Sequence, residues 1–140
     1  MNWILKLNLA ATLYMTGLIW FVQLVHYPLF AKVGTENFAA YESRHRQLTG
    51  LAVAPAMLLE LATAIVLVLR PPALLRGEWA WAGLALVAVI WASTFLLQVP
   101  QHDVLQHGFE ARSHERLVAS NWIRTAAWTL RAGGLLWLIR

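Results

Sequence analysis

The sequence contains no cysteine and very little charge. Only 13% of its 140 residues are Asp, Glu, Lys or Arg, against about 25% in an average soluble domain. Without cysteine, disulfides, thiolate metal sites and thiol catalysis are excluded. The low charge, together with an apolar share of 59%, indicates a chain whose main solvent is a lipid bilayer.

Dense basic runs are also missing, although the formal net charge is +4. Lys and Arg are scattered, so they form no stripe that follows a phosphate backbone, and we expect no nucleic-acid partner. The chain has eight tryptophans instead, and tryptophan concentrates where a membrane meets water. The expected partners are the lipid bilayer and a lipophilic small molecule, and a homo-oligomer of the chain remains open.

Four segments reach the roughly 20 apolar residues that a membrane-spanning helix needs. They predict an all-α fold, an integral membrane four-helix bundle that forms a single four-span domain over residues 1–140. Both termini then lie on one side, which is basic with one acid and favours the cytoplasmic side of a bacterial inner membrane. The predicted spans are about residues 7–30, 48–69, 79–99 and 117–139.

Two long connections lie on the side opposite the termini. Residues 31–47 include Thr35, a residue type favoured at helix N-termini, and predict a short amphipathic helix between spans 1 and 2. Residues 100–116 begin with Pro100, which is expected to break or distort the helix there. All histidines fall on or near this side, which we therefore predict to be the functional face. They are His26, His45, His102, His107 and His114.

The last span carries a polar stripe. Arg124 and Arg131 differ by only about 20° around a helix with about 100° per residue, and Asn121 lies beside them. Such a stripe should face the interior of the bundle, not lipid. Glu60, the single acid within the predicted spans, lies at the depth of Arg131. We therefore predict a structural ion pair between Glu60 and Arg131.

A second polar layer lies closer to the histidine side and draws residues from all four spans or their flanks. Imidazole, amide and guanidinium groups there suit proton transfer and the binding of a small polar group. The candidate catalytic residues are His26, His45, His102, Arg124 and Asn121. The candidate substrate-binding residues are Gln23, Gln98 and Trp122.

Two kinds of histidine chemistry remain open. Imidazole is a good ligand for Zn, Cu and Fe, so His26, His45 and His102 are candidate metal ligands. Their spacing does not form a metal motif, and the alternative is metal-free acid–base chemistry. The cofactor is therefore Fe, Cu, haem or none.

Four short motifs occur in the order LVHYPLF, GLAVAP, VPQHDVL and NWIR. In this order they resemble DUF1772, a family of small four-helix membrane proteins that includes anthrone-oxygenase-like members. The likeness covers about residues 10–135. The chain departs from the family pattern at His102, where the family often has Asn, and in carrying His26 and His45. The resemblance implies oxygen-dependent oxidation of phenolic polycyclic substrates, and it supplies no catalytic residues.

Two functions follow as hypotheses. The first is a membrane oxidoreductase, such as a monooxygenase, that acts on a lipophilic aromatic or quinol-like molecule. Arg124, with Asn121, would then stabilise a developing phenolate or peroxide. The alternative is a non-catalytic accessory subunit that binds a cofactor or metal for a larger membrane complex. Gly133 and Gly134 would permit the close helix packing that such an assembly uses.

Overall fold

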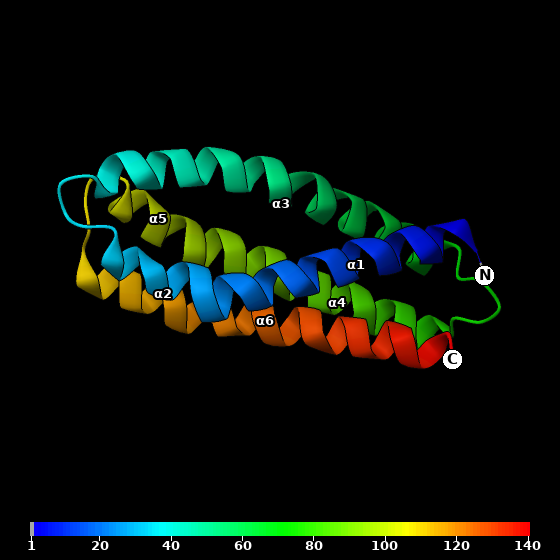
Figure 1. The fold of residues 1–140 in the computed structure, drawn as a ribbon. Coiled ribbons are helices and arrows are strands. Elements are labelled where there is room, and N and C mark those ends of the chain that lie inside the picture. Colours follow the sequence, from blue (N-terminus) through cyan, green and yellow to red (C-terminus); the bar gives the residue numbers. More distant parts are fainter. Residues whose placement is uncertain (1) are drawn as a thin grey trace.

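The structure, a computed structural model that describes residues 2–140, consists of four long helical rods (Figure 1). The first rod comprises α1 (Trp3–Phe21), the π-helical η1 (Val22–His26), α2 (Tyr27–Leu29) and the 3₁₀-helical η2 (Phe30–Lys32). The second rod is α3 (Phe38–Leu69). The third rod comprises α4 (Gly77–Ser93), the π-helical η3 (Thr94–Gln98) and α5 (Val99–Leu105). The fourth rod is α6 (Ala111–Leu138).

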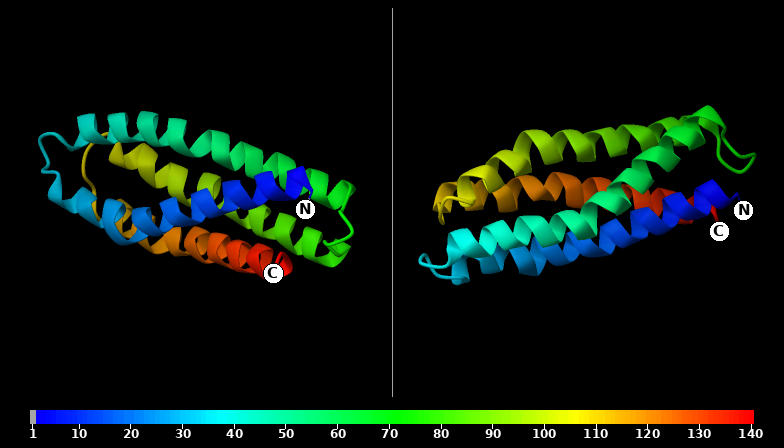
Figure 2. Two further views of the ribbon diagram at one scale, coloured as in Figure 1. Left: turned by 45° about the vertical axis from the view of Figure 1, so that its right-hand side comes forward. Right: turned by 90° about the horizontal axis from the view of Figure 1, so that it is seen from above.

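The four rods form a closed bundle. Helix α1 packs against α3 and α6, and α4 packs against the same two helices from the other side. Both termini lie at one end, and the loops that follow the first and third rods lie at the other (Figures 1 and 2). Residues 2–140 contain no strand. The prediction of an all-α four-helix bundle with its two histidine-side loops together is confirmed.

The predicted separate amphipathic helix is wrong. Residues 38–47 are the first turns of α3, which continues without a break from Phe38 to Leu69. The turn before α3 uses Gly34 at φ +89°, a conformation that glycine adopts readily because it lacks a Cβ. From Phe38 onward no glycine or proline interrupts the chain until Gly50, so the helix has no reason to stop. It also passes through Pro55.

Two prolines shape the first and third rods. Pro28 and Pro100 have no N–H, and in a regular α-helix their rings clash with the carbonyl four residues earlier. Those carbonyls belong to Leu24 and Leu96, which lie inside η1 and η3. The π-turns add one residue and relieve the clash, so the helix is distorted and does not break. Residues after each π-turn, His102 among them, are thereby rotated relative to a regular helix.

Three of the rods are long and apolar enough to cross a membrane: Trp3–Lys32, Phe38–Leu69 and Gly77–Leu105. The fourth, α6, is 28 residues long but is not among them, because charged side chains such as Arg124 and Arg131 lower its hydropathy. Both arginines are buried inside the bundle, with exposed fractions of 8% and 5%. The two arginines of the predicted fourth span are thus hidden in the bundle, as Glu60 is in α3.

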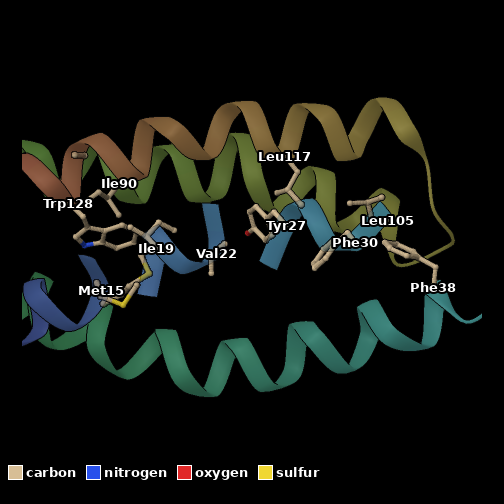
Figure 3. Close-up of a cluster of buried hydrophobic side chains, with 12 residues drawn as sticks. Met15, Ile19, Val22, Tyr27, Phe30, Phe38, Ile90, Leu105, Leu117 and Trp128 are labelled. Carbon is tan, nitrogen blue, oxygen red and sulfur yellow. The ribbon is translucent and has the colours of Figure 1, made fainter. Parts of the chain in front are cut away.

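The histidine-side end of the bundle is closed by aromatic packing. Phe30 and Phe38 meet edge-on with ring centroids 5.9 Å apart, and Phe38 contacts Phe109 at 5.1 Å. Phe30, Phe38 and Tyr27 belong to a buried apolar cluster that extends inward to Trp128 (Figure 3). This packing fixes the ends of the first and third rods and the start of α3, from which the histidines project.

Helix α6 begins with a side-chain cap. The Glu110 carboxylate accepts hydrogen bonds from the backbone N–H of Arg112 at 3.2 Å and of Ser113 at 2.5 Å. Hydrogen bonds from Ser113, its side chain first and then its backbone, lower the pKa of Glu110. The cap is therefore formed by the charged carboxylate and holds the start of α6 in place at neutral pH.

Candidate functional site

The deepest polar cluster is centred on Glu60 and Arg131. The Nε of Arg131 donates to Oε1 of Glu60 at 3.0 Å, and both side chains are buried. Thr12 donates to the same oxygen at 2.6 Å, and the indole of Trp128 donates to Oε2 at 2.9 Å. The ion pair that helical phase and depth predict is therefore present, and both carboxylate oxygens have partners.

The other two nitrogens of Arg131 also have partners. Its Nη1 donates to the carbonyl of Gly83, and its Nη2 donates to Oδ1 of Asn8 at 3.1 Å and to Thr12 at 3.4 Å. Helices α1, α3, α4 and α6 all contribute to this cluster. Because every nitrogen of the guanidinium and both oxygens of the carboxylate have protein partners, the geometry is that of a structural tie across the bundle.

Gly83 provides the close approach that this tie needs. A Cβ added to Gly83 would lie 3.2 Å from Nη1 of Arg131, so we expect Gly83→Ala to displace the guanidinium and lower the thermal unfolding midpoint in detergent. A Cβ at Gly17 meets nothing within 4 Å. The matched control Gly17→Ala should leave the midpoint unchanged or raise it, since alanine favours a helix by about 1 kcal/mol. Equal midpoints for the two variants would contradict this view of Gly83.

Arg124 lies in a different setting, although it is on the same stripe of α6. Its Nε donates to Oδ1 of Asn121 at 3.0 Å, and its Nη1 donates to Thr94 at 3.2 Å. The guanidinium also lies over the ring of Trp128 at 5.7 Å. Within residues 2–140 no carboxylate forms an ion pair with it. Arg124 is thus a buried cation held by neutral groups.

The structure corrects the expected roles of several neighbours. Asn121 donates to Oε1 of Gln23 at 2.9 Å, and Gln23 donates to the carbonyl of Val118 at 3.1 Å. Both amides are buried in contacts between the first rod and α6, and only Asn121 contacts Arg124. Trp122 is 46% exposed and packs edge-on against Trp20 on the outer surface. It cannot bind a substrate inside the bundle.

Above Arg124, three side chains form a hydrogen-bonded chain. His102 contacts Oε1 of Glu42 through Nδ1 at 2.5 Å and the hydroxyl of Tyr27 through Nε2 at 3.1 Å. An ionised carboxylate only accepts, so Nδ1 carries the proton and Nε2 is left as the acceptor of the tyrosine proton. Glu42 therefore holds the imidazole with Nε2 directed at the tyrosine hydroxyl, as a carboxylate holds the histidine of a catalytic triad.

His26 and His45 form a second contact in the same layer. Nε2 of His26 lies 2.9 Å from Nδ1 of His45, and Thr49 contacts that Nδ1 at 3.0 Å. His114 contacts the backbone carbonyl of Tyr27 at 2.7 Å and so fixes the turn that carries the tyrosine. The exposed His107 only contacts the backbone of its own helix. His26, His45 and His102 therefore lie close together as predicted, but they contact different partners.

A cavity of about 190 Å³ connects the arginine layer with the histidine layer. Gln98 lines it as expected, and its Nε2 donates to Ser120 at 2.9 Å. An apolar cavity of about 150 Å³ holds a benzene molecule, so this space accommodates about one aromatic ring. The lining includes Tyr27, His45, Thr94, Gln98, His102 and Arg124.

One group of side chains in residues 2–140 has the composition and spacing of a metal site. Glu42, His45 and His102 each offer a ligand atom, and these atoms lie within 4.8 Å of one another. His26 is not part of the group. The expected ligand set of three histidines is therefore replaced by two histidines and a carboxylate.

Sequence reasoning missed Glu42 and Tyr27. Glu42 and His45 are three residues apart, a spacing that places two side chains on one face of a helix. The same spacing holds in the short helix that was predicted there, so what the sequence did not show is that this segment continues into α3 and carries Glu42 into the bundle. Tyr27 stands between His26 and Pro28, and no periodic pattern gives the direction of a side chain beside a π-turn.

Comparison of the chain with protein-family models, curated proteins and solved structures finds no significant match. The functional argument therefore rests on the contacts described above.

Proposed function

We propose that this chain is a membrane-embedded oxidoreductase that oxidises a lipophilic phenol or quinol, with one aromatic ring held in the cavity between Arg124 and His102. The main support is the hydrogen-bonded chain from Glu42 through His102 to Tyr27. It ends at a cavity that is also lined by Arg124, a buried guanidinium without a carboxylate partner in residues 2–140. The order of motifs that resembles DUF1772 supports the same class of reaction.

The distribution of side chains supports a place within the bilayer. Large apolar side chains such as Leu51, Leu96 and Leu130 are exposed on the outside, whereas Glu60 and Arg131 are buried. In water this arrangement would leave extensive apolar surface uncovered. In lipid it is favourable, because charged groups face the bundle interior and pair there. A lipophilic substrate then reaches the cavity from the membrane.

The site is suited to removing a hydroxyl proton. As the substrate transfers its proton to the Tyr27 oxygen, Tyr27 passes its own proton to Nε2 of His102. Glu42 stabilises the imidazolium that forms. Arg124 supplies fixed positive charge for the phenolate, and it does so without reorganisation because Asn121 and Thr94 already hold it.

Oxidation requires an electron acceptor, and we assign this role to dioxygen. A quinol then loses two protons and two electrons, and dioxygen gains both to become hydrogen peroxide, so the products are one quinone and one peroxide. Phenolates give up electrons more readily than phenols do. Proton removal by the Tyr27–His102–Glu42 chain therefore precedes electron transfer.

The cavity favours a single-ring substrate. About 190 Å³ accommodates one ring, whereas a three-ring anthrone needs the surrounding helices to separate. We therefore expect turnover of a short-chain benzoquinol in detergent, measured as oxygen consumption, and much slower turnover of an anthrone. Faster turnover of the anthrone would contradict this choice of substrate.

Tyr27 provides the test of the proton chain. Tyr27→Phe keeps the ring but removes the hydroxyl, so we expect quinol oxidation to fall by about 10²–10⁴-fold, the usual contribution of a positioned acid–base group. The matched control is Tyr14→Phe, because Tyr14 is exposed and its hydroxyl donates only to the carbonyl of Ala52. Equal rates for the two variants would contradict the proposal.

An accessory subunit gives the opposite result. In that case the purified chain oxidises no quinol, and a fixed partner protein co-purifies with it. Oxygen consumption by the purified chain alone therefore separates the two functions.

A further inference from the structure

We infer that Glu42, His45 and His102 bind one divalent first-row transition-metal ion, and that this ion is iron(II). The metal site itself stands on the geometry of these three side chains. The choice of iron rests on the proposed function, because two histidines and one carboxylate with open positions are the ligand set of non-haem iron(II) oxygenases.

The elements that carry the ligands face one another across the histidine-side end of the bundle. Glu42 and His45 are three residues apart on one face of α3, and His102 comes from α5. Their ligand atoms lie within 4.8 Å of one another. To bind a metal at about 2.1 Å from each atom, the two ligand atoms that lie farthest apart must approach each other through a small side-chain movement.

Glu42 carries the second observation that points to a cation. Its side chain is 0% exposed, and within residues 2–140 its Oε2 has no hydrogen-bond partner. An unpaired carboxylate oxygen in the interior is costly, and a bound cation removes that cost. Glu60 shows the contrast, since both of its oxygens are satisfied by protein donors.

The histidines have the outer contacts that orient metal ligands. His45 uses Nδ1 to contact His26 and Thr49, and in the described residues its Nε2 has no partner, so this nitrogen is left for the ion. His102 keeps its contact with the Tyr27 hydroxyl through Nε2 and offers Nδ1. Such outer hydrogen bonds fix the ring orientation of ligand histidines.

The ion and a proton compete for the same place. Nδ1 of His102 donates its proton to Oε1 of Glu42 at 2.5 Å, and this proton lies where an ion bound by both atoms would be. Metal binding replaces this proton, releases it to solvent and becomes weaker as pH falls. The loaded and metal-free forms are therefore two states of one group, and the metal dependence of turnover shows which state the enzyme uses.

The test is elemental analysis of the purified protein after anaerobic loading with iron(II) and removal of free metal. We expect close to one iron per chain in the wild type and in His107→Ala, whose imidazole is exposed, contacts the backbone of its own helix and is not part of the ligand group. Glu42→Gln and His45→Ala should lose the iron, and Glu42→Asp should recover part of it. Tyr27→Phe, which removes only an outer contact, should weaken binding by about 10-fold.

A second measurement guards against misfolding and separates this inference from the proposed function. Cobalt(II) gives visible absorption bands when nitrogen and oxygen ligands bind it, and variants that elute as the wild type on size exclusion are compared by these bands. No metal above background in the wild type, or equal loss in His107→Ala, overturns the metal site. Quinol turnover by wild-type protein that holds no metal above background after loading overturns the metal site alone. Metal binding without turnover overturns the proposed function alone.

Discussion

Replacing Glu60 by Gln is expected to lower the free energy of unfolding in detergent by about 3–5 kcal/mol, the usual effect of removing one partner from a buried ion pair. The substitution leaves the Arg131 guanidinium buried without its counter-ion. A matched control is Glu115→Gln, because Glu115 is exposed on α6, and it should change the free energy of unfolding little.

A double-variant cycle isolates the pair. Arg131→Met should destabilise as strongly as Glu60→Gln, since each leaves the other group unpaired. The double variant should lose less than the sum of the two, because no uncompensated charge remains. Reversible unfolding monitored by helical circular dichroism supplies all four values. Additive losses, or an unchanged Glu60→Gln protein, would show that the pair is not the tie across the bundle.

Arg124→Met is expected to lower turnover and to leave the free energy of unfolding nearly unchanged, unlike Arg131→Met. Quinol oxidation should fall by about 10²–10³-fold, the effect of removing one group that stabilises charge in a transition state. The free energy of unfolding should change little, because Arg124 has no counter-ion to leave unpaired and its burial is itself unfavourable. Measurement of both quantities on Arg124→Met and Arg131→Met separates function from stability on one helix. A strong loss of stability with unchanged turnover in Arg124→Met would contradict the assignment.

Arg124→Lys refines this prediction. Lysine keeps the positive charge but lacks the planar fork that binds Asn121 and Thr94 together. We expect it to restore part of the lost turnover if charge is what the substrate needs, and none if the fork itself positions the substrate. The exposed Arg116 supplies the control substitution Arg116→Met, which should leave turnover unchanged.

The features that the sequence predicted correctly depend on periodicity and depth. Helical phase places Arg124 and Arg131 on one stripe, and counting residues from the membrane surface places Glu60 opposite Arg131. The angle around a helix and the depth along it both increase in proportion to residue number. They can therefore be calculated without knowing how the helices are distorted. For the same reason the four rods and the common end of the two long loops were predictable.

The features that the sequence did not predict depend on where helices begin and how they are distorted. Glu42 escaped notice because α3 begins at Phe38 and not near residue 48. Tyr27 escaped because η1 adds a residue to the turn, which rotates the following side chains by about 100° relative to a regular helix. Asn121, by contrast, had the predicted position but lies beneath the arginine and not beside the cavity.

The most direct measurement of the central claim is the ionisation state of a lipophilic phenol bound in the cavity. A single-ring nitrophenol with a short alkyl chain reports this by its visible absorption. With the purified protein at a pH below the pKa of the free nitrophenol, we predict the phenolate spectrum, and we predict its loss in Arg124→Met and in Tyr27→Phe but not in Tyr14→Phe. A nitrophenol that remains neutral when bound, or that does not bind at all, would contradict the account.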